Sequence, residues 1–324
     1  MLTAASAAQN AAPEATSTSS AASQAVEEVV VRGRRLGEIE FDLRLYIREF
    51  VEEIAAPART RGYARWRRRL CVGVHNLENT AAQYIVDRIS SVALDIGLEA
   101  GEPGCRPEVN ILFAADANEM AAYMVDAQPH VFRPAGGNAG MDLGLEALDT
   151  FVQSDRAVRW WHVSLPVDAR TGAAAIELPS TRGLCEGNPL LIRGSSSSLC
   201  PPNVAVAGPS RLHSATRDDL RYVIIIVDAT RLNGATWQQL ADYLAIVSLA
   251  QIDPNANPAA FDSILNLFGN PSAYSGLTDW DRSYLRALYS IDLERVPHAQ
   301  RNEVISRIEK QERTAARSGQ ELRD

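Results

Sequence analysis

The sequence lacks several features that would place it in a large functional class. Its 324 residues contain no apolar run of about 18 residues, the length that a membrane-spanning helix needs. The 32 Lys and Arg residues are outnumbered by 40 Asp and Glu residues, and the net charge of −8 argues against a broadly basic nucleic-acid-binding protein. Apolar residues make up 46% of the chain, an ordinary value for a globular protein, and the length predicts one or two domains.

Motifs of common enzyme and metal-binding classes are also missing. The four cysteines include no Cys-x-x-Cys pair, which argues against a structural zinc site. The Gly-x-Ser-x-Gly motif of serine hydrolases is absent. The glycine-rich stretch 136–140 lacks the Lys-Ser/Thr ending of a phosphate-binding loop and follows no strand. The sequence therefore gives no indication of a cofactor or a metal ion.

The first residues have a composition typical of disordered and exported segments. Leu2 to Ala25 consists almost entirely of Ala, Ser, Thr, Gln and Pro, which leaves little to bury. Ala5-Ser6-Ala7 fits the pattern of a signal-peptide cleavage site, although the basic and apolar regions of such a peptide are missing. We therefore expect residues 1–35 to be a disordered leader whose start lies inside a signal peptide, and the protein to be periplasmic or secreted in a bacterium. The alternative is an Ala-rich tail of a cytosolic protein.

A short β-prone run follows this stretch. Val26 to Gly33 resembles the TonB box of outer-membrane transporters and contains Glu27, Glu28, Val29, Val30 and Val31. Such a segment acts by adding a strand to the sheet edge of a partner through main-chain hydrogen bonds. We therefore predict a docking strand for an envelope protein, with an edge strand or a linker as the alternative.

Hydrophobic spacing along the rest of the chain predicts alternating helices and strands. We expect helices over 41–55, 79–97 (capped by Asn79 or Thr80), 116–127, 237–252, 258–268, 279–290 and from Pro297 onward. Strands are expected over 70–74, 109–115, 158–167 and 222–227, with loops over 130–147 and 169–210 and a turn over 216–219. These elements predict a single mixed α/β domain over 36–310, followed by a frayed tail over 311–324.

The cysteines suggest two disulfides. Strand 70–74, helix 79–97 and strand 109–115 predict a right-handed crossover between parallel strands, which places Cys71 and Cys105 at the same edge of the sheet. A bridge between them is geometrically feasible if the strands are neighbours. Cys185 and Cys200 bracket a loop of 14 residues, so we favour a second bridge there. The alternative is four buried thiols in a reducing compartment.

The order of elements resembles that of the zincin peptidases. Leu277 to Tyr289 resembles a segment at the C-terminal end of metzincin catalytic domains. The stretch from about 67 to 289 is also similar to uncharacterised exported proteins of alphaproteobacteria, through the motifs Cys71–Val74, Gly104–Asn110, Leu240–Ala245 and Leu277–Tyr289. The resemblance implies a zincin-like mixed sheet with a crossover helix, a buried central helix and C-terminal helices, and it brings no known activity.

The sequence lacks the zinc-binding motif of the zincins. A zincin helix needs His-Glu-x-x-His, because one helical turn then places two imidazoles on one face beside a glutamate base. The buried helix has Ala241-Asp242-Tyr243-Leu244-Ala245 instead, and no two histidines of the chain are four residues apart. The resemblance therefore implies a scaffold without its metal, and we interpret Asp242 as a first-turn acid favoured by the helix dipole.

One strand carries the most suggestive cluster of side chains. Trp160 and His162 share one face of the strand over 158–167, whereas Trp161 points to the other. That face would offer an aromatic platform with a titratable group for a glycan or a peptide. The alternative is that the tryptophans fill the core and His162 is hydrogen-bonded inside it. We expect a non-catalytic binding module of the cell envelope, and the competing hypothesis is a hydrolase of peptide or glycan with an open cleft beside His162.

Overall fold

A computed structural model describes residues 36–57, 61–67, 69–133, 143–173, 175 and 213–321. The chain divides into two compact units, Met1–Leu45 and Tyr46–Asp324. The described part of the first unit is the beginning of helix α2 (Leu36–Ile54), and all other elements belong to the second unit. The expected leader with its candidate docking strand over 26–33 lies outside the described residues, as do Cys185 and Cys200.

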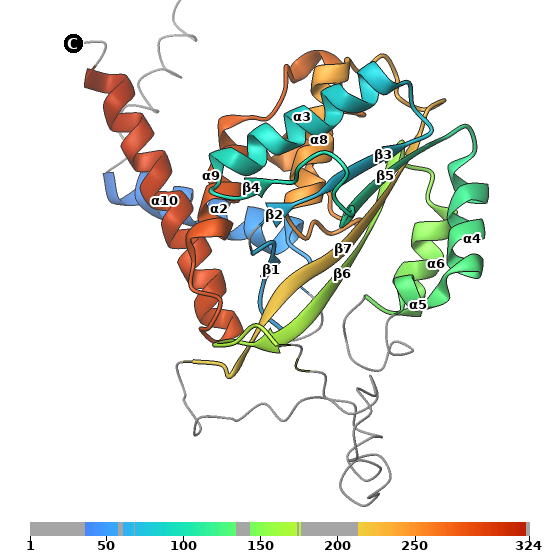
Figure 1. Cartoon of the computed structure of the whole chain (residues 1–324). Coiled ribbons are helices and arrows are strands. Elements are labelled where there is room, and N and C mark those ends of the chain that lie inside the picture. Colours follow the sequence, from blue (N-terminus) through green and yellow to red (C-terminus); the bar gives the residue numbers. More distant parts are fainter. Residues whose placement is uncertain are drawn as a thin grey trace, which may run out of the picture. The chain divides into compact units, whose positions relative to one another are not determined.

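The second unit is built around a sheet in which three strands run parallel. They are β3 (Val72–His75), β5 (Val109–Ala114) and β7 (Thr216–Asp228), in the order β3-β5-β7. Strand β6 (Val158–Asp168) pairs antiparallel with β7, and the short β1 (Ala64–Arg65) lies parallel to the start of β7. Because β6 accompanies β7 along most of its length, β1 and β5 occupy the opposite edge of β7 (Figure 1).

The predicted crossover between parallel strands is confirmed. Strand β3 leads into helix α3 (Asn79–Asp95), and the chain returns as β5, with Val72 paired to Val109. The residue that caps the helix is Glu78, whose carboxylate accepts bonds from two main-chain amides, so the expected cap at Asn79 or Thr80 is wrong by one or two residues. A second small parallel sheet lies between these elements, formed by β2 (Arg69–Leu70) and β4 (Glu99–Ala100).

The disulfide between Cys71 and Cys105 is also confirmed. Cys71 lies at the start of β3 and Cys105 in the turn before β5, with their Cα atoms 6.1 Å apart. Both residues therefore lie at the amino edge of the parallel strands, where the crossover brings them together.

Helices cover both faces of the sheet, which confirms the α/β class (Figure 1). One face packs against α4 (Ala117–Ala127), α5 (Pro129–Phe132) and α6 (Leu145–Gln153), through a core that includes Trp161 and Ile226. The other face carries α3 and α8 (Trp237–Leu249). Two further helices follow α8 in the chain, α9 (Asp279–Ser290) and α10 (Pro297–Glu321). With both faces covered, Val223 to Val227 can be apolar throughout and fully buried.

Three expectations about local structure are wrong. The predicted turn over 216–219 is the start of β7, because these polar residues pair with β6 and β1 and because arginines contact the carboxylates of Asp218 and Asp219. Part of the predicted loop over 130–147 is helical, since α5 and the start of α6 lie in it. The predicted helix over 258–268 is instead two 3₁₀ turns, η2 (Pro258–Ala260) and η3 (Ile264–Asn266), with a third, η4 (Pro271–Ala273), just beyond.

The C-terminal helices agree better with the sequence pattern. Helix α9 begins and ends where predicted, and a capping box of Thr278 and Asp281 starts it. Helix α10 begins at Pro297 as expected but continues to Glu321, well beyond the expected domain boundary at 310. No helix in the described ranges is long and apolar enough to cross a bilayer.

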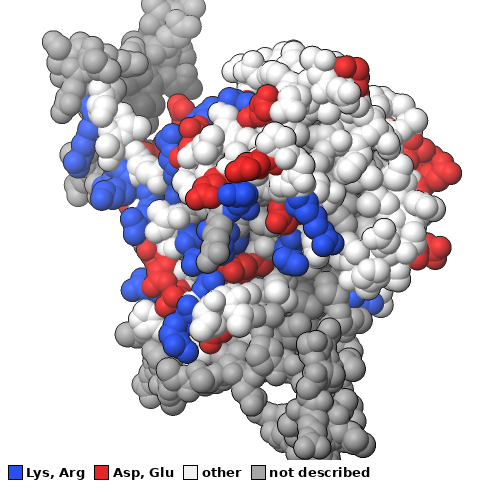
Figure 2. Space-filling view, in the orientation of Figure 1, with Lys and Arg blue, Asp and Glu red and all other residues white. Residues whose placement is uncertain are grey.

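Charged side chains of both signs lie interspersed on the surface. In the face drawn in Figure 2 they concentrate over α10 and around β2 and β4, whereas the part over the beginning of α3 carries few of them. Several of the charges form ion pairs between or within helices, such as Arg301 with Glu52 and Arg307 with Glu303. Exposed pairs of this kind contribute little to stability.

Candidate functional site

The proposed ligand face of Trp160 and His162 is covered by helix α8. Trp160 is 2% exposed and His162 is 6% exposed. The indole Nε1 of Trp160 donates to the carbonyl of Ile252, and Nε2 of His162 lies 2.8 Å from the carbonyl oxygen of Val247 on α8. Burial lowers the pKa of His162 to about 4, so the imidazole is neutral near pH 7 and donates through Nε2. The interpretation as an open platform is therefore corrected: these side chains are part of the core.

The aspartate of the degenerate zincin motif is engaged in a buried ion pair. Asp242 is fully buried, and its carboxylate accepts bonds from Arg88 Nε at 2.5 Å and Nη2 at 3.1 Å, and from the amide of Leu277 at 3.0 Å. It lies in the second turn of α8, so its interpretation as a first-turn acid is wrong. A Cβ at Gly276 would collide with this carboxylate, which shows how tightly the loop before α9 packs against it. Asp242 therefore joins α3, α8 and that loop.

Metal-binding chemistry finds no support in the described ranges. No three His, Cys, Asp or Glu side chains lie close enough together there to hold a metal ion. Asp281, the other fully buried carboxylate of the C-terminal region, accepts bonds from Ser263 Oγ and from the amides of Ile264 and Thr278. Both buried aspartates are thus occupied by structural contacts.

A pocket lies at the carboxyl edge of the sheet. Its volume is about 500 Å³, within the range of small-molecule sites. Three parts of the chain line it: the entry into β6, the loop after β7 together with α8, and η3 with the residues that directly follow it. In sheets of parallel strands, ligands commonly bind outside the carboxyl ends of the strands. The polar lining residues are Asp155, Arg156, Arg231, Asn233 and Tyr243, and the apolar ones include Val158, Leu265 and Phe268.

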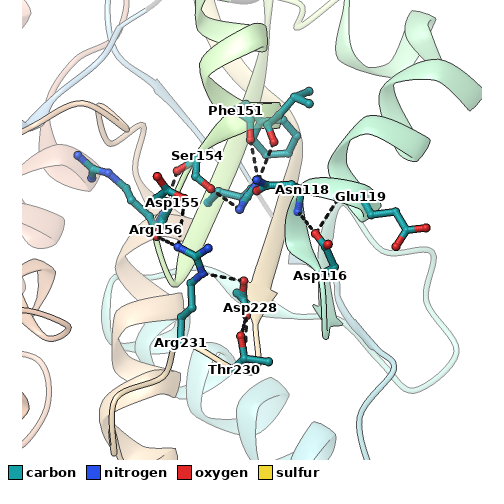
Figure 3. A network of polar contacts seen from close by, with 12 residues as sticks. Asp116, Asn118, Glu119, Phe151, Ser154, Asp155, Arg156, Asp228, Thr230 and Arg231 are labelled. Carbon is teal, nitrogen blue, oxygen red and sulfur yellow. Dashed lines mark hydrogen bonds and ion pairs between the residues drawn. The ribbon is translucent and has the colours of Figure 1, made fainter.

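A network of polar contacts fixes one side of this pocket (Figure 3). Asp228 ends β7, and its carboxylate accepts bonds from the amide and hydroxyl of Thr230. Nε of Arg231 lies 3.2 Å from the same carboxylate, while Nη1 donates to the carbonyl of Asp155 at 2.7 Å. Arg231 also pairs with the carboxylate of Asp155, which is largely exposed. Arg231 therefore ties the loop after β7 to the loop before β6, and its charge is compensated on both sides.

Arg156 differs from Arg231 in having no such partner. Its side chain is exposed, and Figure 3 shows it extending away from Asp228 and Arg231. No carboxylate in the described part of the chain forms an ion pair with it. The guanidinium is close enough to Tyr243 to lower the pKa of that phenol, although burial has the larger effect and the pKa is raised overall. The phenol therefore keeps its proton at neutral pH and can donate a hydrogen bond.

Aromatic rings form the base of the pocket beside this arginine. The ring of Tyr243 meets Phe268 edge-on at 5.0 Å and Trp160 at 6.2 Å. Trp160 also borders a second hollow, of about 30 Å³, together with Arg159 and Asn255, and Arg156 and Val158 line both hollows. Trp160 therefore contributes to the site only from behind, as packing for Tyr243.

Arg159 supports the same region from within. It is 3% exposed, and its two terminal nitrogens donate to the carbonyls of Phe151, Val152 and Ser154, which end α6. Its Nε is buried without a hydrogen-bond partner among the described residues. Arg159 thus holds the end of α6 beside the two hollows and leaves one donor unsatisfied there.

The sequence analysis missed Arg156, Arg231, Asp228 and the role of Tyr243. Its predicted strand ended at Val227, one residue before the aspartate that organises the loop. The available signal was Asp228, the polar residue that directly follows the apolar run Tyr222–Val227, because the carboxyl end of such a strand is where ligands commonly bind.

Comparisons with known proteins add no assignment. No protein-family model matches the chain, and neither a curated protein nor a solved structure shows significant similarity to it. The resemblance to a zincin without metal ligands therefore stays a prediction.

Proposed function

We propose that this protein is an extracytoplasmic binding protein that holds a small ligand in the pocket at the carboxyl edge of its sheet. The observation that carries this proposal is the pocket of about 500 Å³, which combines polar side chains with an apolar and aromatic wall. The arrangement of β3, α3, β5, β6, β7 and α8 supports a zincin-like scaffold as its frame, without the metal site of that class.

The groups needed by the competing hydrolase are engaged elsewhere. An enzyme working at His162 requires an open cleft around that imidazole, whereas α8 packs over it. Asp242 is ion-paired to Arg88 and closed off from solvent. These contacts favour binding over hydrolysis as the function of the fold.

The disulfide supports a location outside the cytoplasm. A bridge between Cys71 and Cys105 is typical of oxidising compartments, which supports a periplasmic or secreted location. An envelope protein that binds the segment Val26–Gly33 remains our predicted partner, independently of the pocket.

The proposal is tested by blocking the pocket with a side chain. Gly269 lines it with an ordinary backbone conformation, and a Cβ there would meet only the carbonyl of Asn266, at 3.5 Å. Gly269→Leu should therefore fill the pocket without disturbing the fold. Asn270→Leu adds the same side chain one residue further on, outside the lining, and is the matched control.

Binding is measured by amide chemical shifts of the ¹⁵N-labelled, oxidised protein. The probes are 3-phenylpropionate, 3-phenylpropionamide, 2-phenylethylammonium and glucose, each titrated to millimolar concentration. We expect at least one probe to shift the amides of Val158, Arg231 and Gly269, and Gly269→Leu but not Asn270→Leu to abolish the effect. If no probe shifts these amides in the unmodified protein, the pocket is not a binding site and the proposal is wrong.

A further inference from the structure

We propose that the pocket selects a singly charged carboxylate attached to an apolar body of about the size of a phenyl group, with Arg156 as the anchor of the carboxylate. This inference rests on the proposed binding function and adds the class of ligand to it.

The charge of the ligand follows from the way the two arginines are used. Arg231 already faces Asp228 and Asp155, at 3.2 Å in both cases. Arg156 lines the same pocket without an ion-pair partner in the described residues. A guanidinium presents two parallel N–H donors that match the two oxygens of a carboxylate, so an unpaired arginine at the mouth of a pocket favours that group.

Tyr243 adds a second polar group to the lining of the pocket. It is 4% exposed, and its hydroxyl has no hydrogen-bond partner in the part of the chain that the structure describes. Tyr243 and Arg156 line the same pocket, and the charge of Arg156 acts to lower the pKa of this phenol against the larger effect of burial. A carboxylate held by Arg156 would therefore find a hydroxyl donor within the same site.

The apolar body of the ligand is inferred from the apolar residues that line the pocket. Val158, Leu265 and Phe268 line it, and Val158 is fully buried at the start of β6. Phe268 is held edge-on by Tyr243, so an aromatic ring of the ligand could pack beside an existing aromatic pair. The volume admits a ring with a short chain but is far larger than acetate or phosphate needs.

The charge balance of the rim argues against more highly charged anions. The carboxylate of Asp155 is 87% exposed on the same rim, next in sequence to Arg156. It would repel the second negative charge of a phosphate ester, whereas a single carboxylate can be accommodated by one arginine. We therefore expect inorganic phosphate to compete poorly.

Two sources could supply this chemistry, a free small acid or the C-terminus of a peptide. The experiment compares 3-phenylpropionate with its neutral amide, and N-acetyl-Ala-Ala-Phe as the free acid with its C-terminal amide. Dissociation constants come from the amide shifts of pocket residues in the full chain with its disulfide intact. A preference for the peptide acid over 3-phenylpropionate identifies a C-terminus as the source, and the reverse order identifies a small acid.

We expect each acid to bind about tenfold or more tightly than its amide, the difference that a hydrogen-bonded charge typically makes. Arg156→Gln should abolish this preference and leave the affinity for the amide unchanged. Arg106→Gln, which removes an exposed arginine at the opposite edge of the sheet, is the matched control and should keep the preference.

The outcomes separate the ligand class from the binding function. Equal binding of acid and amide at the pocket would overturn the carboxylate proposal while leaving a binding site in place. Displacement of the acid by inorganic phosphate at a similar concentration would have the same meaning. The comparison of acid and amide uses the unmodified protein, so it decides the matter even if a variant fails to fold. Absence of binding by every probe would instead refute the proposed function itself.

Discussion

Replacing Arg88 should destabilise the protein more than replacing its partner Asp242, although the two side chains form one ion pair. The reason is their unequal burial: the Asp242 side chain is 1% exposed, whereas that of Arg88 is 28% exposed. Without Arg88, the carboxylate stays buried with the amide of Leu277 as its remaining donor. Such an uncompensated charge costs about 3–5 kcal/mol. We expect this loss for Arg88→Met, which keeps most of the volume of the arginine stem.

Asp242→Asn leaves a different situation. The amide oxygen can still accept from Leu277, and the freed guanidinium can reach water because Arg88 is partly exposed. The loss should then be close to that of one charged hydrogen bond, about 1.5–3 kcal/mol. The double variant should be more stable than Arg88→Met alone, because it no longer buries an unpaired charge.

The measurement is urea unfolding at pH 7, followed by far-UV circular dichroism, with the change in free energy taken from the midpoint at constant slope. Val92→Ala, a buried aliphatic truncation on the same helix, reports the cost of an ordinary packing change. A loss for Arg88→Met equal to or smaller than that for Asp242→Asn would refute the reasoning. A double variant that is less stable than either single variant would also refute it. Removing the charge of Asp242 would then bring no relief, which means that the carboxylate is stable without its arginine.

Three further predictions concern stability. Burial lowers the pKa of His162 from 6.5 to about 4, so the unfolded chain binds this proton more readily and stability is lost as the pH falls from 6.5 to 4. His162→Gln should escape this loss and gain about 3 kcal/mol relative to the unmodified protein between pH 7 and pH 4. Burial raises the pKa of Asp218 from 3.8 to about 6, so the folded protein binds this proton more readily and gains stability as the pH falls from 6 to 3.8. Asp218→Asn should lack this gain and so lose stability relative to the unmodified protein over that range. For either variant, a pH dependence of stability in urea titrations that is parallel to that of the unmodified protein would contradict the assignment. Changing Cys71 and Cys105 to serine opens a loop with a sequence separation of 34 and should cost about 4 kcal/mol, whereas an unchanged urea midpoint would mean that the bridge does not form.

Much of the fold could be predicted from residue patterns because the information is local. The apolar run Tyr222–Val227 can only be a strand covered on both faces, and the capping pair Thr278 and Asp281 fixes the start of α9. The crossover between parallel strands also predicted the disulfide, since it places both cysteines at one edge. The start of β7 could not be predicted in this way. Its charged residues look like a turn until Arg61, more than 150 positions away, is seen to pair with Asp218.

The site was harder to predict because a side chain's role depends on what covers it. Alternation in the strand correctly put Trp160 and His162 on one face, yet it could not tell that α8 lies over that face. Asp242 was noticed for its place in a degenerate motif, while its partner Arg88 lies on another helix. Arg156 was not noticed at all, because an exposed arginine in a loop has no pattern that separates it from the many other arginines of the chain.

The position of the pocket follows from how the polar groups of this fold are distributed. On the α8 side of the sheet, the two buried groups that a hydrolase would use already have internal partners: His162 donates to Val247, and Asp242 accepts from Arg88 and Leu277. A ligand there would have to displace these contacts, and each buried group left unpaired would cost about 1–3 kcal/mol. At the carboxyl edge, Arg156 and the hydroxyl of Tyr243 require no such exchange among the described residues, so a ligand gains their contacts at the cost of desolvation alone. These contacts therefore support our proposal of a ligand at the end of the strands rather than chemistry beneath α8.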